Sequence, residues 1–460
     1  MAQKPSLPQG TRDFGPRQMS RRHYLFSTIR QVFEKFGFQP LETPAMENLS
    51  VLTGKYGDEG DQLLFKILNN GLNHPSKEEK ARGAFEQVLQ GKNDANLTER
   101  ALRYDLTVPF ARYVVMNQHE LSFPFRRYQI QPVWRADRPQ RGRYREFYQC
   151  DADVIGTDSL ICEAEIVLMI SEVFQKLGLQ DYSIKVNNRK VLSGITEVIG
   201  AAGKETDFFV AIDKLDKIGV ARVLEELQER GFSPAAIAAL EPLLQKQAQG
   251  SVTLPFLQEL LAQSETGTQG VAELQEMYQL LEAFGGTGAP LELDLTLARG
   301  LSYYTGAIFE VKPTSVQMGS ICGGGRYDNL TGVFGLKGMS GVGISFGIDR
   351  IYDVLEELNL FPTAAESSTQ VLIINFGAAE QPHALRLLAQ LRQAGLRAEL
   401  YPDSAKMKKQ MDYANKKGIP YVMLLGEEEI KEGKTALKDM QTGSQERLSP
   451  QEAIQKIGRA

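Results

Sequence analysis

The sequence predicts an α+β core with a helical insertion, followed by a smaller C-terminal α/β domain. Short apolar and aromatic runs, separated by polar turns, occupy residues 121–156 and return after residue 290. Between them, residues 190–285 are rich in Leu, Ala, Glu and Gln and show no strand pattern, which indicates an inserted helical segment. After residue 370, apolar runs alternate with helical patterns, which is typical of a small α/β domain.

The composition excludes several classes of protein. Hydrophobic residues make up 42% and charged residues 24% of the 460 residues, which excludes a disordered or fibrous chain. Apolar runs stay below the roughly 18–20 residues of a membrane helix, and residues 1–18 have no apolar core, so neither a membrane span nor a signal peptide is expected. The three cysteines lack C-x-x-C spacing, which excludes a cysteine-rich zinc site and favours a cytoplasmic location. The net charge of −5 excludes a globally basic nucleic-acid binder but allows a local basic strip.

The N-terminal part predicts one long helix followed by extended chain. Apolar side chains recur at steps of three and four over residues 17–36, as on one face of an amphipathic helix. Gly37 ends this helix, and Pro40 and Pro44 favour an extended stretch after it. Residues 70–100 are polar and are expected to be exposed.

A strand–loop–strand unit is predicted next. Residues 125–134, FRRYQIQPVW, predict one strand, and residues 146–156, EFYQCDADVIG, predict the returning strand. The unit carries seven arginines: Arg126, Arg127, Arg135, Arg138, Arg141, Arg143 and Arg145. A guanidinium group presents a planar donor fork that suits phosphate oxygens, so this density favours a polyphosphate ligand, an RNA end, or both. A solvated basic hairpin is the alternative, but the interleaved aromatic side chains favour a nucleotide because a purine can stack on them.

Strands also flank the helical insertion. One is expected over residues 182–188, and strands return over 291–300 and 303–311. Tyr303 and Tyr304 would point to opposite faces of the last strand, so only one of them would reach a pocket directly. For residues 297–310, which contain Arg299 and the two tyrosines, the alternative to a binding site is an ordinary sheet strand with a surface arginine.

Two glycine-rich segments follow, GGGRYD at 323–328 and GVGISFGIDR at 341–350. Glycines permit a ligand to approach the backbone closely, but neither segment matches a P-loop or a Rossmann fingerprint. Arg350 stands at the start of the following helix, where the guanidinium and the helix dipole both favour an anion. An ordinary strand–turn–helix is the alternative.

The C-terminal part is expected to fold separately. Residues 361–369 are predicted to be a linker, and Ser449 and Glu452 form a capping-box pattern at the start of the last helix. The lysines around Met407 indicate a charged helix. The histidines are scattered without H-x-x-x-H spacing, so a histidine metal site is not expected.

Taken together, five motifs in this order resemble the histidyl-tRNA synthetases, a family of class II aminoacyl-tRNA synthetases. LPQGTRDFGP (7–16) resembles the opening of the family, and residues 38–52 resemble motif 1. Residues 125–156 resemble motif 2 and residues 341–350 motif 3. LARGLSYYTG (297–306) and GGGRYD resemble the two histidine-specific signatures, and the match covers essentially the whole chain.

The resemblance implies an architecture that agrees with these segments. It implies an antiparallel six-stranded catalytic sheet flanked by helices, and a homodimer formed through motif 1. The expected domains are a catalytic core over 1–360 with a helical insertion at about 190–287, a linker over 361–369, and an anticodon-binding domain over 370–460.

The resemblance also implies a histidine–tRNA ligase. Such an enzyme activates L-histidine with ATP to histidyl-adenylate and pyrophosphate, with Mg²⁺ expected beside the ATP, and then transfers histidine to the 3′ end of tRNA(His). The expected histidine-binding residues are Asp105, Thr107 and Gln149 at the α-amino group, Asp153 at the imidazole, and the aromatic pair Tyr303 and Tyr304. The expected ATP-binding residues are Arg135 at the α-phosphate, Arg350 at the γ-phosphate, and Asp137 and Arg143 in the hairpin. Catalysis is expected from Arg135, Arg350 and the histidine-specific arginine, Arg299.

Two positions depart from the pattern of the family. Two alternative functions of related proteins are also compared with this sequence. Ser302 replaces an aspartate of the first signature, and Asp153 stands where many bacterial members carry glutamate. A non-catalytic paralogue, such as the regulatory subunit of ATP phosphoribosyltransferase, generally lacks the catalytic arginine and the C-terminal domain, whereas this chain has both. Class II enzymes for threonine or proline lack the two histidine signatures.

Overall fold

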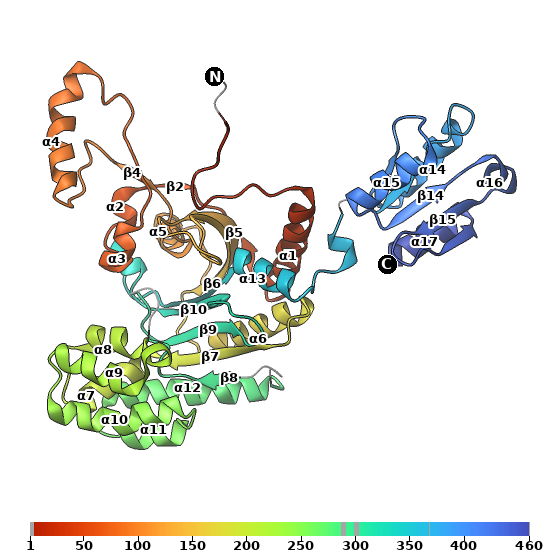
Figure 1. The fold of residues 1–460 in the computed structure, drawn as a ribbon. Coiled ribbons are helices and arrows are strands. Elements are labelled where there is room, and N and C mark those ends of the chain that lie inside the picture. Colours follow the sequence, from red (N-terminus) through yellow and green to blue (C-terminus); the bar gives the residue numbers. More distant parts are fainter. Residues whose placement is uncertain (1–3, 287–290, 299–302, 368, 460) are drawn as a thin grey trace. The chain divides into compact units, whose positions relative to one another are not determined.

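The computed structural model describes residues 4–286, 291–298, 303–367 and 369–459 (Figure 1). The chain divides into two compact units. One comprises Met1–Arg12 and Thr28–Leu358, and the other comprises Asp13–Ser27 and Asn359–Ala460. The first unit contains the large sheet and the helical insertion, and the second contains the C-terminal α/β fold.

The large sheet has an antiparallel centre, as the resemblance implies. Within the described residues, six strands run antiparallel in the order β5-β6-β11-β10-β9-β7. Their bounds are β5 (Phe125–Trp134), β6 (Glu146–Ile155), β11 (Gly341–Gly347), β10 (Cys322–Tyr327), β9 (Ala307–Pro313) and β7 (Tyr182–Asn188). Two short parallel strands extend its edges, β1 (Gln39–Pro40) beside β5 and β8 (Leu291–Leu293) beside β7. Of the strand expected over 291–300, residues 291–293 form β8 and the described residues 294–298 are not in a strand.

Helices position the ends of these strands. The first, α1 (Pro16–Lys35), lies within one residue of its expected bounds, and α6 (Ile161–Lys176) packs Phe174 against Phe346 of β11 with ring centroids 5.8 Å apart. Because α13 (Ile348–Glu357) follows β11 directly, Arg350 lies in its first turn, as the sequence predicts.

A small sheet, ordered β2-β4-β3, lies next to α5 (Thr107–Asn117). The elements between α1 and α5 are β2 (Met46–Asn48), α2 (Leu49–Leu52), α3 (Gly57–Gln62), β3 (Lys66–Ile67), η1 (Pro75–Lys77), α4 (Glu78–Leu89) and β4 (Arg100–Leu102). Residues 70–100 are mostly exposed, as expected, but the polar composition did not predict α4.

The insertion is helical throughout its described residues, as predicted. Its helices are α7 (Arg189–Val198), α8 (Glu205–Ile212), α9 (Leu215–Glu229), α10 (Pro234–Ala248), α11 (Leu254–Leu260) and α12 (Glu265–Ala283). Ser264 caps α12 by accepting a hydrogen bond from the Gly267 backbone at 2.8 Å. A Cβ atom on Gly194 of α7 would lie 2.4 Å from the Gly267 Cα, so glycine lets these two helices touch.

The C-terminal α/β fold has a sheet ordered β13-β12-β14-β15-β16, with the first three strands parallel and the others antiparallel. Its elements are η3 (Thr363–Ala365), β12 (Val371–Ile373), α14 (Gln381–Gln393), β13 (Ala398–Leu400), α15 (Met407–Lys417), β14 (Tyr421–Leu424), α16 (Glu427–Glu432), β15 (Thr435–Asp439), β16 (Gln445–Leu448) and α17 (Pro450–Arg459). The Ser449–Glu452 capping box forms, and the lysines around Met407 do begin a charged helix. None of the described helices is both long and apolar enough to span a membrane.

Candidate active site

Alternate residues of β6 line one side of the site. Because successive side chains of a strand point to opposite faces, Gln149, Asp151 and Asp153 share one face. With Thr107, Tyr304 and Tyr327, Asp151 and Asp153 line a small cavity of about 20 Å³, and Gln149 lies on the same strand face. The carboxylates of Asp151 and Asp153 are 1% and 2% exposed, and Asp105 beside them is 1% exposed. Buried carboxylates are costly without partners, so the partners of each define what the pocket can bind.

Asp153 is held by residues from three strands. The register pairs it with Arg127 of β5 and with Gly343 of β11. The Arg127 Nη2 lies 2.9 Å from Asp153 Oδ2, and the Tyr327 hydroxyl donates to Oδ1 at 2.7 Å. A Cβ atom at position 343 would lie 2.0 Å from Oδ1, so glycine there leaves room for the carboxylate. Burial raises the pKa of Asp153, and the Arg127 charge opposes that rise.

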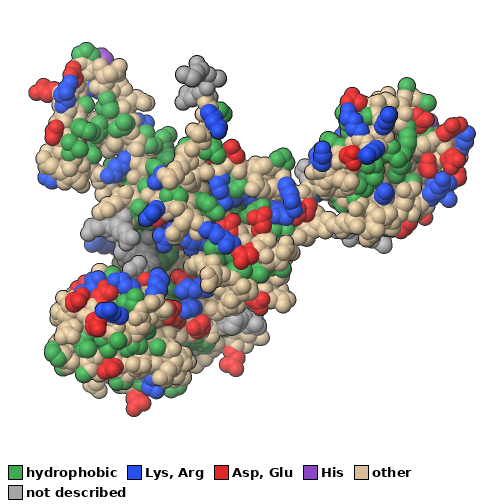
Figure 2. All heavy atoms as spheres, viewed as in Figure 1, with side chains coloured by type: hydrophobic (Ala, Val, Ile, Leu, Met, Phe, Trp, Pro, Cys, Tyr) green, Lys and Arg blue, Asp and Glu red, His purple; other side chains and the backbone are tan. Residues whose placement is uncertain are grey.

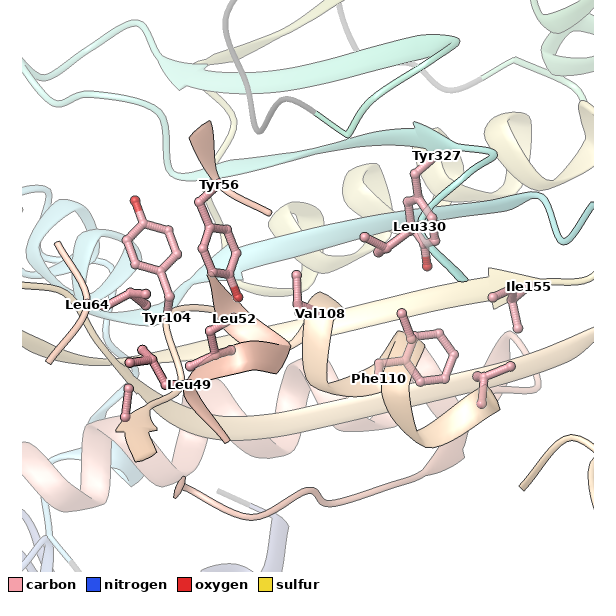
Figure 3. Close-up of a cluster of buried hydrophobic side chains, with 13 residues drawn as sticks. Leu49, Leu52, Tyr56, Leu64, Tyr104, Val108, Phe110, Ile155, Tyr327 and Leu330 are labelled. Atoms are coloured by element: carbon pink, nitrogen blue, oxygen red, sulfur yellow. The ribbon is translucent and has the colours of Figure 1, made fainter. Parts of the chain in front are cut away.

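Asp105 immediately precedes α5 and accepts three hydrogen bonds. They come from the Tyr56 hydroxyl at 2.9 Å, the Val108 backbone at 3.2 Å and the Tyr303 hydroxyl at 3.3 Å. Burial raises the pKa of this carboxyl. Figure 3 shows the cluster of buried hydrophobic side chains that contains Tyr56 and Tyr104. The ring centroids of these two tyrosines are 4.5 Å apart. The hydroxyl donors thus come from tyrosines whose rings are fixed by packing.

Tyr303 and Tyr304 do not lie in a strand, which corrects the prediction of a strand over 303–311. Both precede β9, and the ring centroids are 5.0 Å apart in an edge-to-face arrangement. Tyr303 hydrogen-bonds with Asp105 and Thr107, while Tyr304 lines the cavity. Of the two rings, Tyr304 alone belongs to the lining of the cavity, as expected for one of the pair, whereas the Tyr303 hydroxyl reaches the buried carboxylate of Asp105.

Gln149 and Asp151 complete the polar lining. The Gln149 amide nitrogen donates to the Ser345 hydroxyl at 2.6 Å, whereas its buried Oε1 has no hydrogen-bond partner among the described residues. That oxygen can accept from an ammonium group. Burial raises the pKa of Asp151 to about 7, with Asp153 adding to the rise and Arg127 opposing it. Sequence reasoning missed Asp151, although its place between Gln149 and Asp153 on one strand face could have revealed it.

A group of arginines lies where the β5–β6 hairpin meets α13. Arg135 donates from Nε to the Tyr104 carbonyl at 3.0 Å, and its guanidinium lies 4.2 Å from the Tyr104 ring centroid. Arg350 donates to the carbonyls of Gly142 and Ser320 at 2.7 and 2.5 Å. Burial lowers the pKa of Arg350, and the charges of Arg143 and Arg135 lower it further. Such mutual repulsion is relieved when an anion binds between the cations.

The other predicted residues are partly accounted for. Asp137 lies 3.7 Å from Arg143 within the hairpin loop. Arg126 and Arg127 belong to β5 and pair with Glu165 and Asp153, so they are not part of the loop. The positions of Arg299 and Ser302 fall outside the described residues.

In the second histidine-like signature, Arg326 forms a buried ion pair with Glu163. That pair fixes β10, and Tyr327 then points to Asp153. The segment GGGRYD therefore contributes a hydroxyl donor, and not only close backbone approach, to the pocket.

Family models match both parts of the chain. Residues 76–351 match the model of histidyl-tRNA synthetase, and residues 370–459 match that of an anticodon-binding domain. A histidine–tRNA ligase from Cytophaga hutchinsonii is 57% identical over 99% of this chain and 100% of its own length. One from Phocaeicola vulgatus is 57% identical over 99% of both chains.

Solved structures agree with these matches. The crystal structure of histidyl-tRNA synthetase from Nostoc sp. PCC 7120 has a TM-score of 0.82 at 32% identity and covers 100% of both chains. A chain from Bacillus halodurans C, described as an ATP phosphoribosyltransferase regulatory subunit/histidyl-tRNA synthetase, has a TM-score of 0.68 at 22% identity. It covers 89% of this chain and 97% of its own and shows a shared fold alone. By its full-length identity to the ligases, the chain belongs to the histidyl-tRNA synthetase family.

Proposed function

We propose that the chain activates L-histidine with ATP and transfers it to the 3′ end of tRNA(His) at the site described above. Histidine–tRNA ligation is the function of its family, and class II synthetases use ATP. One observation carries the residue-level proposal: buried carboxylates lie at one end of the site and a group of guanidinium groups lies at the other. An ammonium and an imidazole suit the first, and a triphosphate suits the second.

The amino acid is recognised in the pocket between β6 and α5. Asp105, Thr107 and the free Gln149 Oε1 receive the α-ammonium group, and Asp153 accepts from the imidazole. Asp153 can do so while bound to Arg127 and Tyr327, because a carboxylate has about four acceptor sites. The rings of Tyr303 and Tyr304 form the walls.

Adenylation follows from positioning and charge. The histidine carboxylate attacks the α-phosphorus of ATP in line, the bond to the β-phosphate oxygen breaks, and pyrophosphate leaves. No protein base is required, because the nucleophile is already ionised. Arg135 stabilises the α-phosphate and Arg350 the γ-phosphate, while Arg143 and Asp137 hold the hairpin over the nucleotide. Arg299 is retained as a catalytic residue on the resemblance alone.

The end of the site that carries the arginines also suits Mg²⁺. Asp137 and Glu310 both act electrostatically on Arg350, the residue proposed for the γ-phosphate, so carboxylates are available near that end of the site. Mg²⁺ is ordinarily held by one or two carboxylates together with substrate phosphates, which this donor set allows. The ion would neutralise phosphate charge there.

The transfer step requires RNA recognition beyond this site. The tRNA 3′-hydroxyl attacks the carbonyl of the adenylate, and AMP leaves. We assign residues 1–360 to the catalytic core with its insertion at about 190–287, 361–369 to a linker and 370–460 to anticodon binding. We also propose a homodimer through motif 1 and a cytoplasmic location, which the free thiols of Cys150, Cys162 and Cys322 support.

Two assays test this proposal. Purified protein should catalyse ATP–pyrophosphate exchange with L-histidine and not with threonine or proline; exchange without histidine dependence would contradict it. A chain ending at Ser367 keeps Glu366 with its partners Arg17 and Arg21. It should retain exchange but charge tRNA poorly, mainly through a raised KM for tRNA that recovers at low salt. A shortened chain that charges tRNA as well as the full chain would exclude an RNA-binding role for residues 370–460.

A further inference from the structure

A second cavity, of about 450 Å³, lies where the helical insertion meets the segment before β9. Its walls come from α7, α8 and the start of α12, and from Ala298, Tyr304 and Thr305 of the core. Tyr304 also lines the amino-acid cavity, so the two cavities share one side chain. Figure 2 shows several Lys and Arg side chains along this border between insertion and core.

The cavity is cationic. Arg189 and Lys190 are the charged members of its described lining, and Lys190 pairs with Glu273. Arg189 has no carboxylate partner among the described residues, and its buried Nε has no acceptor there. Its guanidinium lies 4.7 Å from the Phe209 ring centroid, which fixes its plane. Burial lowers the pKa of Arg189 to about 10, so the group remains charged at neutral pH.

The rest of the lining suits an anion as well. Hydroxyl groups come from Ser193, Thr206 and Thr266, whereas the hydroxyl of Thr305 already donates to Asp328 at 2.6 Å. The helices α7, α8 and α12 all begin at this cavity. The positive dipole end of α7 adds to the Arg189 charge, whereas Glu205 and Asp207 in the first turn of α8 and Glu265 in that of α12 offset part of theirs. A cavity with an unpaired guanidinium, hydroxyls and three helix starts favours a phosphate group over a neutral ligand.

We propose that this cavity binds a phosphodiester of the single-stranded acceptor end of the tRNA and so delivers the terminal ribose to the adenylate beside Tyr304. This inference rests on the proposed function. ATP is assigned to the arginines of the hairpin and α13, and histidine to the carboxylate pocket. The remaining substrate is a nucleic acid, and its reactive end carries phosphates close to the transferred amino acid.

The first experiment compares two arginines of the insertion. Arg189→Gln removes the cavity charge, whereas Arg222→Gln removes an exposed arginine of α9 that pairs with Glu225. In single-turnover transfer from preformed histidyl-adenylate, Arg189→Gln should weaken the apparent tRNA affinity by about tenfold or more. The slope of log affinity against log salt should become shallower by about 0.7, as for one lost contact to a single strand. Arg222→Gln should change the affinity several-fold less.

The second experiment leaves Arg189 in place. Thr206 is exposed at the start of α8, where either a carboxylate or an amide is tolerated. Thr206→Glu should repel the phosphodiester and slow transfer relative to the pyrophosphate-exchange rate of the same preparation. Thr206→Gln, of the same size without the charge, should keep that ratio.

The outcomes separate the two proposals. Equal behaviour of the Glu and Gln variants at position 206, or of the two arginine variants, would overturn the phosphodiester site while leaving the ligase intact. A raised KM for pyrophosphate in Arg189→Gln, with normal transfer, would assign the cavity to pyrophosphate and also overturn the inference. Absence of histidine-dependent exchange in the unaltered chain would instead refute the proposed function.

Discussion

The two ends of the active site differ in how their charges are neutralised. In the amino-acid pocket, the carboxylates of Asp105 and Asp153 are almost fully buried and already hydrogen-bonded by tyrosines or paired with Arg127. In the hairpin, the Arg143 side chain is 54% exposed, and Arg135 hydrogen-bonds to a backbone carbonyl. The pocket is therefore built before its ligand arrives, whereas the arginine group would be completed only by the phosphates that we propose it binds.

This difference has a consequence for stability. Removing a partner from a buried pair leaves an uncompensated charge, at a cost of roughly 3–5 kcal/mol. Removing one of several mutually repelling arginines leaves no uncompensated buried charge. Substitutions in the pocket should thus affect folding and substrate affinity together, whereas substitutions in the hairpin should affect ATP binding or catalysis with little effect on folding.

The largest effect is expected at Arg135. Arg135→Ala should lower the adenylation rate by about 10²–10³, roughly 2.7–4 kcal/mol of lost charge stabilisation in the transition state. Pyrophosphate exchange measures the rate, and the melting temperature should stay close to that of the unaltered protein. Near-normal exchange in the folded variant would refute the role of Arg135 at the α-phosphate.

A smaller effect is expected at Asp153, but on a different parameter. Asp153→Asn keeps the shape and removes the charge, so the KM for histidine should rise by about 10- to 100-fold, from the roughly 1.5–3 kcal/mol of a hydrogen bond to a charged group. The KM for ATP should change little, and the melting temperature should fall because Arg127 loses its partner. If both KM values rose together, Asp153 would have a structural role only.

The pH dependence of histidine affinity tests Asp151. With a pKa of about 7, its ionised fraction rises roughly tenfold between pH 6 and 8, in a pocket where Arg127, Asp153 and Asp105 act on it. The KM for histidine should fall across this range by up to about tenfold more than in Asp151→Asn, which also corrects for titration of the substrate. Identical profiles would show that Asp151 stays in one protonation state.

The same group predicts the sign of a stability effect. An unfolded aspartate ionises near pH ~3.9, whereas folded Asp151 keeps its proton to about pH 7. Between these two pH values the folded state therefore binds more protons than the unfolded state. The contribution of Asp151 to the free energy of unfolding falls as the pH rises through that window. Asp151→Asn should remove this part of the slope in thermal melts.

The smallest effect is expected at Arg143. Its exposed pairing with Asp137 at 3.7 Å resembles surface ion pairs, which contribute about 0.2–1 kcal/mol, so Arg143→Ala should raise the KM for ATP by no more than about fivefold. The neighbouring exposed Arg138→Ala is the matched control. A loss as large as that for Arg135→Ala would mean that the hairpin closes on the nucleotide and buries Arg143.

Local sequence patterns predicted the strands whose ends are marked by loop or turn residues. The strands over 125–134 and 182–188 form at their predicted residues, because apolar and polar positions are bounded by loops and turns. The edge strand β1 and the polar strand β16 were not predicted, and the strand predicted over 291–300 forms as β8 in its first three residues. Strands of two to four residues depend on the partner beside them, and for β1 and β8 that partner is distant in sequence.

The sequence by itself determined the family, the antiparallel core, the helical insertion and the residue types of the site. Tertiary structure decided which of those residues face one another. Asp153 meets Arg127 and Tyr327 through the register of three strands, and the cavity of Arg189 reaches Tyr304 across more than a hundred residues of chain. Local propensity sets secondary structure from near neighbours, whereas burial, pairing and cavities depend on contacts between distant segments, which no local pattern encodes.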